Sequence, residues 1–201
     1  MMEVTTQLRE QIRAIAFDLD GTLVHSALDF TAIRHELNWP ADTDLLQRLQ
    51  AIDSEHERAM ADAVIRRHEM EAAHKSYILP GVLRCLAQLQ QQQIPTAILT
   101  RNMRQATMHM LERLQIPIQL VLTREDCAAK PDPAGLFKIA EHFSVAPSEL
   151  LYIGDYHFDL TTAANAGAVS CLLLNEQNHQ FASMADWVMT DYDSLARALI
   201  S

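Results

Sequence analysis

Five short apolar runs recur along the chain, and each has the length and composition of a buried strand. They cover residues 14–18, 96–100, 119–122, 150–154 and 168–174. Runs such as "QLVLT" and "LLYIG" are almost uninterrupted by polar residues, which is typical of strands covered on both faces. The segments after them carry apolar residues three or four positions apart, which predicts helices within residues 80–93, 103–115 and 133–143. The alternation predicts an α/β fold with a doubly wound parallel sheet.

Residues 27–78 break this alternation because they contain no strand-like run. Their apolar residues recur at helical intervals among many charges, so we expect helix throughout, with a turn near residues 38–42. The "LPGV" sequence at 79–82 marks the return to the sheet. The pattern therefore predicts a small α-helical insertion after the first strand, lying over the carboxyl ends of the strands. The core domain would comprise residues 1–26 and 79–201.

Composition and charge narrow the classes of partner. The chain has 201 residues, and 16 Lys and Arg against 26 Asp and Glu give a net charge of -10. Such a surface repels nucleic acid and anionic lipid, so we expect neither as a partner. Cys85, Cys127 and Cys171 lack metal-ligand spacing and are interpreted as reduced thiols. With no signal-like N-terminus and no apolar segment of about 18 residues, the sequence predicts a cytoplasmic protein without a membrane span.

Two acids directly follow the first apolar run, in "AFDLDGTLV". Asp18 and Asp20 are two residues apart, so their side chains point to the same side of the sheet and repel each other. We expect such a pair to be retained for a cation, a shared proton or a reaction. Gly21 indicates that the backbone bends sharply there or that another group approaches closely.

Polar residues also follow the other predicted strands. The second ends in Thr100-Arg101-Asn102, Lys130 follows the third, and the fourth ends in Gly154-Asp155, with Asp159 four residues on. In an open parallel sheet the ligand crevice lies at the carboxyl edge, so these side chains are expected to converge there.

This ordered set resembles the haloacid dehalogenase (HAD) superfamily of phosphotransferases. The resemblance rests on "DLDGT" at 18–22, "LTRN" at 99–102, "KPDP" at 130–133 and "GDYHFD" at 154–159, and the tail "AANAGAVSCLLL" also fits. It implies the doubly wound core, with residues 27–78 as a small helical cap. It further implies a phosphatase similar to phosphoglycolate phosphatases that hydrolyses a small phosphorylated metabolite with Mg²⁺.

The resemblance also implies roles for the acids. Asp18 would be the nucleophile that forms an aspartyl phosphate, and Asp20 the general acid and base. Magnesium would be held by the Asp18 carboxylate, the Asp20 carbonyl and the Asp155 carboxylate. Asp159 is a candidate metal residue too, though a water-mediated or orienting role fits it better, and a plain helix N-terminal acid remains an equal alternative.

The remaining site residues would bind the phosphoryl group. Thr100 would hold a non-bridging oxygen at a helix N-terminus, and Gly21 and Asn102 would complete the cradle. Lys130 would place a cation against Asp18 and the phosphate. Arg101 would either reach the substrate or lie on the surface.

Some features leave alternatives open. Tyr156 and His157 stand where the family more often has a small residue, which leaves the size of the substrate open. Among the insertion's cations, Arg34 and Arg67 are candidates for substrate contact. Asp20 argues against dehalogenation. A sugar phosphomutase and a non-catalytic partner-binding domain remain alternatives, and the sequence does not indicate an oligomeric state.

Overall fold

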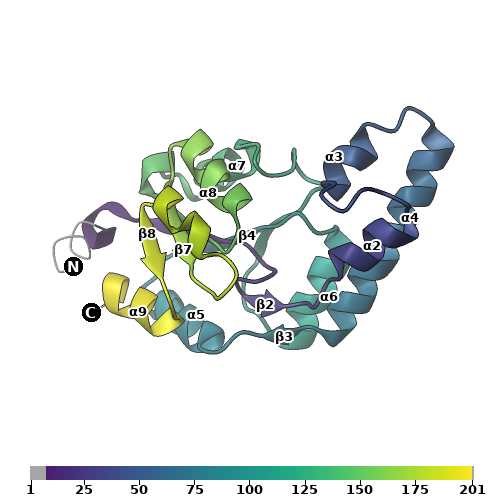
Figure 1. Ribbon diagram of the computed structural model, residues 1–201. Helices are drawn as coiled ribbons and strands as arrows, with labels where there is room; N and C mark the ends of the chain where they lie inside the picture. Colours follow the sequence, from purple (N-terminus) through teal and green to yellow (C-terminus); the bar gives the residue numbers. More distant parts are fainter. Residues whose placement is uncertain (1–7, 201) are drawn as a thin grey trace.

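The computed structural model describes residues 8–200, and its centre is a parallel sheet of six strands in the order β5-β4-β1-β6-β7-β8 (Figure 1). The first strand, β1, lies in the middle, where Phe17 pairs with Ile98 on one side and Ile153 on the other. This confirms the predicted doubly wound sheet. The strands are β1 (Ala14–Phe17), β4 (Thr96–Leu99), β5 (Leu120–Leu122), β6 (Leu150–Gly154), β7 (Val169–Leu173) and β8 (Trp187–Met189).

Helices cover both faces of the sheet, and the residues of each strand alternate between two cores. Ile15 and Phe17 pack on the side of α5 (Val82–Gln91), α6 (Arg104–Leu114) and α9 (Tyr192–Ile200). Ala14 and Ala16 pack on the opposite side, against α7 (Ala134–Phe143) and α8 (His157–Ala166). Two short 3₁₀ helices, Pro147–Glu149 and His179–Met184, complete the connections. Because both faces are buried, the strands consist mostly of apolar residues.

Three short strands were not predicted. The edge strand β8 has only three residues, two of which are half-buried, so its apolar signal is weak. Strands β2 (Val24–His25) and β3 (Tyr77–Ile78) pair antiparallel and have two residues each. They place the start and the end of the helical segment side by side, which a strand-length pattern in the sequence cannot indicate.

The helical segment between them contains α2 (Phe30–Glu36), α3 (Leu45–Gln50) and α4 (Glu55–Lys75), which lie together beyond one end of the core (Figure 1). The side chains of Asp29, Asp44 and Ser54 cap the three helices. A small core of Ile33, Leu45 and Ile65 holds them together. The turn expected near residues 38–42 lies in the loop between α2 and α3. The expectation of helix is wrong for the loop between α3 and α4 and for β3, whereas the boundaries of the insertion stay a prediction.

The longest of these helices, α4, is attached to the core at α6. The Glu69 carboxylate of α4 pairs with the Arg124 guanidinium of the core, and both side chains are buried. A second oxygen of Glu69 accepts a hydrogen bond from the Met103 backbone N–H at 3.3 Å. This buried contact fixes α4 against the loops at the carboxyl edge of the sheet.

Two expectations from composition concern the state of the cysteines and the presence of a membrane span. Cys85, Cys127 and Cys171 are free thiols, as expected. Among residues 8–200, no helix combines the length and the apolar content needed to cross a bilayer.

Candidate functional site

The end of β1 delivers Asp18 and Asp20 to the carboxyl edge of the sheet. The Asp18 N–H still continues the pairing, donating to the Ile153 carbonyl at 2.8 Å, and the residue as a whole is only 7% exposed. The chain then turns at Gly21, which has a φ of 75° and donates to the Val24 carbonyl at 2.7 Å. The Tyr192 hydroxyl holds this turn from α9, donating to the Thr22 carbonyl at 2.6 Å.

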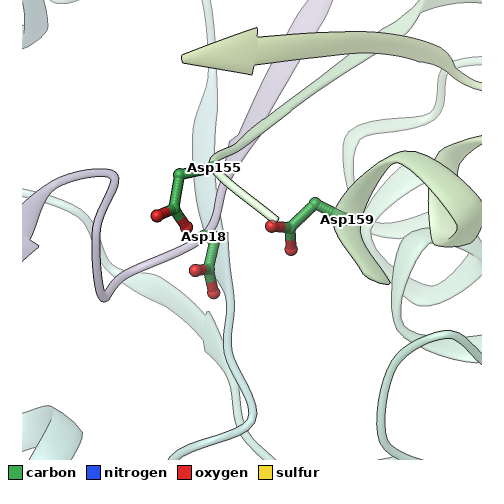
Figure 2. A group of neighbouring side chains, drawn as sticks. All are labelled: Asp18, Asp155 and Asp159. Carbon is green, nitrogen blue, oxygen red and sulfur yellow. The ribbon is translucent and has the colours of Figure 1, made fainter. Parts of the chain in front are cut away.

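Three carboxylates gather at this edge and face one another (Figure 2). Asp18 follows β1, Asp155 follows β6, and Asp159 lies in the first turn of α8, and one oxygen of each lies within 4.8 Å of the others. Lys130 joins two of them, because its Nζ donates to Asp18 Oδ1 and to Asp159 Oδ1 at 2.6 Å each. Residues up to 141 positions apart in the sequence thus meet as the strand-end pattern predicted.

The charges of this cluster do not balance. Burial raises the pKa of Asp18 well above its usual range, although the charge of Lys130 opposes it. Burial and then the charge of Asp159 raise the pKa of Asp155 to about 7. Although burial alone would lower the pKa of Lys130, the two carboxylates raise it, so this amine stays charged. One cation for three carboxylates, of which Asp18 and Asp159 are buried and Asp155 is half-buried, leaves room in the charge balance for a divalent ion.

The donor set fits Mg²⁺, which prefers oxygen ligands and is commonly held by one or two carboxylates. Asp18 and Asp155 are the carboxylates best placed to bind it. Asp159 is already engaged, since Oδ1 accepts hydrogen bonds from Lys130 and from the Tyr152 hydroxyl, and Oδ2 accepts one from the Tyr156 N–H at 3.0 Å. Its contacts therefore agree with an orienting role.

Close backbone packing holds two of the acids in place. A Cβ at Gly21 would overlap the Asp155 carboxylate, and a Cβ at Gly154 would overlap the Asp159 side chain. The bend expected at Gly21 is present, and the group that approaches its backbone is Asp155.

Gly21→Ala is expected to reduce activity about a hundredfold, because the methyl group displaces Asp155 and a misplacement of about 1 Å can cost that much. Gly167→Ala is the matched control: φ there is 69°, similar to that of Gly21, but a Cβ would meet open space. Turnover of an aryl phosphate and affinity for Mg²⁺ would be measured for both variants. Equal activity in the two variants would contradict the packing argument.

Asp20 lies beside the predicted phosphate cradle. Its Oδ2 accepts a short hydrogen bond from the Asn102 side-chain amide, and its Oδ1 is buried without a partner among the described residues. Burial raises the pKa of Asp20, which favours a carboxyl that holds a proton. Thr100 is buried at the end of β4, and its hydroxyl accepts a hydrogen bond from the Asn102 N–H at 3.2 Å.

Arg101 is half-buried and paired with a carboxylate of the helical insertion, and a role in substrate binding stays a prediction. One terminal nitrogen lies 2.7 Å from both carboxylate oxygens of Asp44, and the guanidinium lies 4.4 Å from the centre of the Phe158 ring. The two cations of the insertion that were candidates for substrate contact pair with other groups. The Arg34 Nε donates to the Thr43 carbonyl at 2.8 Å, and Arg67 pairs with Glu36 and Glu71 on an exposed face.

Two residues that support the acids were not found from the sequence. The Tyr152 hydroxyl lies within 2.9 Å of the Leu99 carbonyl and 3.1 Å of Asp159 Oδ1. The Asn178 amide donates to the carbonyls of Asp155 at 2.8 Å and Leu173 at 3.0 Å. Asn178 follows β7, so the strand-end argument could have found it, whereas Tyr152 lies inside an apolar run, where only its hydroxyl signals a need for a partner.

Comparisons with known proteins agree with this geometry. The family model of haloacid dehalogenase-like hydrolases matches residues 15–173. A phosphoglycolate phosphatase from Photobacterium profundum is 31% identical over 186 residues, which cover 78% of this chain and 81% of that protein. A haloacid dehalogenase-like hydrolase domain-containing protein of Arabidopsis thaliana is 27% identical over 185 residues, covering 86% of this chain and 75% of that protein.

Solved structures share the fold. A hydrolase from Pseudomonas syringae superposes with a TM-score of 0.78 at 22% identity, covering 92% of this chain and 96% of that one. The match confirms the predicted enzyme class, a hydrolase of this superfamily, and the similarity to phosphoglycolate phosphatases supports a phosphatase. The chain therefore belongs to the haloacid dehalogenase-like hydrolases and resembles their phosphoglycolate-phosphatase-like members.

Proposed function

We propose that this protein is a Mg²⁺-dependent phosphatase that hydrolyses a small phosphomonoester through an aspartyl phosphate on Asp18. The observation that carries the proposal is the Lys130 amine bridging Asp18 and Asp159 beside Asp155, because it unites the acids and the cation that phosphoryl transfer needs. The partner would be a small phosphorylated metabolite, since an acidic chain does not favour nucleic acid.

In this proposal each side chain has one task. Asp18 Oδ2, the oxygen not bound by Lys130, attacks phosphorus, so that one oxygen–phosphorus bond forms as the ester bond breaks. Asp20, held by Asn102, gives its proton to the leaving oxygen and later takes one from water. Lys130 and the backbone around Thr100 offset the charge on the phosphoryl oxygens.

Magnesium would be held by the carboxylates of Asp18 and Asp155 and the carbonyl of Asp20, and it would neutralise the developing charge on the phosphoryl group. Asp159 and Asn178 would orient these groups from outside. We further propose that α2–α4 form a cap that excludes water, since Glu69 and Asp44 attach this segment to the loops of the site.

The test is hydrolysis of p-nitrophenyl phosphate by the purified protein with and without Mg²⁺, followed by a panel of phosphorylated metabolites. We expect turnover that is lost with a chelator and restored by Mg²⁺. Conversion of glucose 1-phosphate to the 6-phosphate without release of phosphate would replace this proposal with a phosphomutase. Absence of turnover of every phosphoester would favour a non-catalytic domain.

Stabilisation by Mg²⁺ is expected to increase with pH. In the metal-free protein the pKa of Asp155 is raised from 3.8 to about 7, so the folded state binds this proton more tightly than the unfolded state does. The stability that the bound proton contributes is therefore lost as the pH rises from the lower to the higher of these pKa values. Mg²⁺ needs the ionised carboxylate and competes with the proton. A hundredfold excess of Mg²⁺ over Kd would stabilise by about 2.7 kcal/mol, which corresponds to several degrees in Tm.

The measurement is the shift in Tm on adding Mg²⁺ at about pH 5.5 and at about pH 8. These values lie on either side of the Asp155 pKa, which is about 7. The shift should be larger at the higher pH and should be lost in Asp155→Asn. A shift that is as large at the lower pH would contradict a role for the Asp155 carboxylate in binding the metal.

A further inference from the structure

The loops at the carboxyl edge of the sheet supply few cations to the site. The loops that follow β1, β4, β5, β6 and β7 contain three Lys and Arg residues, namely Arg101, Arg124 and Lys130. A leaving group with a negative charge of its own would need one of these cations, because the phosphoryl group already approaches a cluster of acids.

All three cations are matched by carboxylates of the protein itself. Lys130 is held by Asp18 and Asp159. Arg124 pairs with Glu69, and their side chains are 8% and 5% exposed. Each would have to lose a buried partner before binding a second anion, which leaves an unpaired buried charge.

Arg101 is the most accessible of the three, and its partner comes from the helical insertion. Asp44 caps α3, where it accepts a hydrogen bond from the Gln47 N–H at 2.9 Å, and also pairs with Arg101 at 2.7 Å. The Phe158 ring fixes the guanidinium from another side. Asp44 therefore already pairs with the guanidinium to which a second anion of a substrate would otherwise bind, and its own charge repels such a group.

Building on the function proposed above, we propose that the substrate is a phosphomonoester with an uncharged leaving group, such as a polyol or sugar phosphate. Asp44 sets this specificity by neutralising Arg101. The chain would thus differ from relatives named for phosphoglycolate, whose leaving group carries a carboxylate.

The test compares 2-phosphoglycolate with 2-hydroxyethyl phosphate, which is similar in size but has an uncharged leaving group. For the wild-type protein we expect kcat/KM to favour 2-hydroxyethyl phosphate at least about tenfold, as one unfavourable charge contact of about 1.4 kcal/mol would give. Asp44→Asn keeps a side-chain oxygen for the helix cap but frees Arg101. The ratio should then move toward phosphoglycolate about tenfold, mainly through KM.

The controls separate charge at Arg101 from general effects. Asp44→Ser, which also retains a cap, should behave like Asp44→Asn if the latter folds poorly. The gain should disappear in the Asp44→Asn/Arg101→Gln double variant. Asp42→Asn, an exposed acid in the same loop, should leave the ratio unchanged.

The outcomes distinguish this inference from the function on which it rests. Equal or better turnover of phosphoglycolate by the wild-type protein would overturn the inference and leave the phosphatase proposal standing. An Asp44→Asn ratio equal to that of the wild type would do the same. Absence of turnover of every phosphoester, including p-nitrophenyl phosphate and both alkyl phosphates, would overturn both.

Discussion

Asp18→Asn is expected to abolish phosphatase activity, with a loss on the order of a thousandfold or more, because a neutral amide cannot attack phosphorus. The fold should be unaffected. Asn has nearly the same shape as Asp, and its carbonyl oxygen can still accept the hydrogen bond from Lys130. In the metal-free protein the substitution also removes one of three carboxylates that repel one another, so its Tm should be at least that of the wild type.

The measurement is kcat for p-nitrophenyl phosphate together with thermal unfolding. Asp193→Asn makes the same chemical change on an exposed side chain of α9 that pairs with Arg84, and it should retain full activity. An Asp18→Asn protein that is folded and keeps more than a small fraction of wild-type turnover would show that another group performs the attack.

Asp20→Asn is expected to have the second largest effect, and the size of the effect should depend on the leaving group. General acid catalysis contributes about 10²–10⁴-fold to the rate. A sugar alkoxide needs the proton far more than p-nitrophenolate does, so the loss should be larger for a sugar phosphate. With p-nitrophenyl phosphate the first step should survive, whereas the second lacks its base, so the phosphoenzyme should accumulate.

Rapid mixing of Asp20→Asn with p-nitrophenyl phosphate should therefore release about one p-nitrophenol per protein before turnover slows, which is the kinetic sign of a covalent intermediate. Wild-type protein under the same conditions is the reference. Equal losses for the alkyl and the aryl substrate, with no burst, would remove Asp20 from the acid–base role.

The core of the fold could be predicted because its strands are buried on both faces. Ile15 and Phe17 face one core while Ala14 and Ala16 face the other, so a continuous apolar run marks the strand. β8 escaped prediction because it is a short edge strand with two half-buried residues. β2 and β3 depend on contacts between residues far apart in the sequence, Val24 with Ile78 at 54 positions and His25 with Tyr77 at 52, which no local pattern encodes.

The strand-end positions of the site could be predicted because the apolar runs mark where the strands end. Asp18, Thr100 and Asp155 each follow an apolar run, and parallel strands bring their carboxyl ends to one edge. The roles assigned to these residues stay predictions.

The partners of Arg101 could not be predicted. Asp44 lies 57 positions away in the sequence. Phe158 belongs to α8, which follows β6, and β1 lies between β6 and the strand that precedes Arg101, β4. Arg34 and Arg67 illustrate the same limit, because helical spacing shows which residues share a face but not which face meets the core.

The most direct test of the central claim is the identification of the phosphorylated residue. Asp20→Asn would be mixed with p-nitrophenyl phosphate and Mg²⁺, quenched and treated with borohydride, which reduces an acyl phosphate to the alcohol. Peptide mass spectrometry should then find homoserine at position 18 and unmodified Asp155 and Asp159. Homoserine at another acid, or none at all despite a burst of p-nitrophenol, would contradict Asp18 as the residue that carries the phosphoryl group.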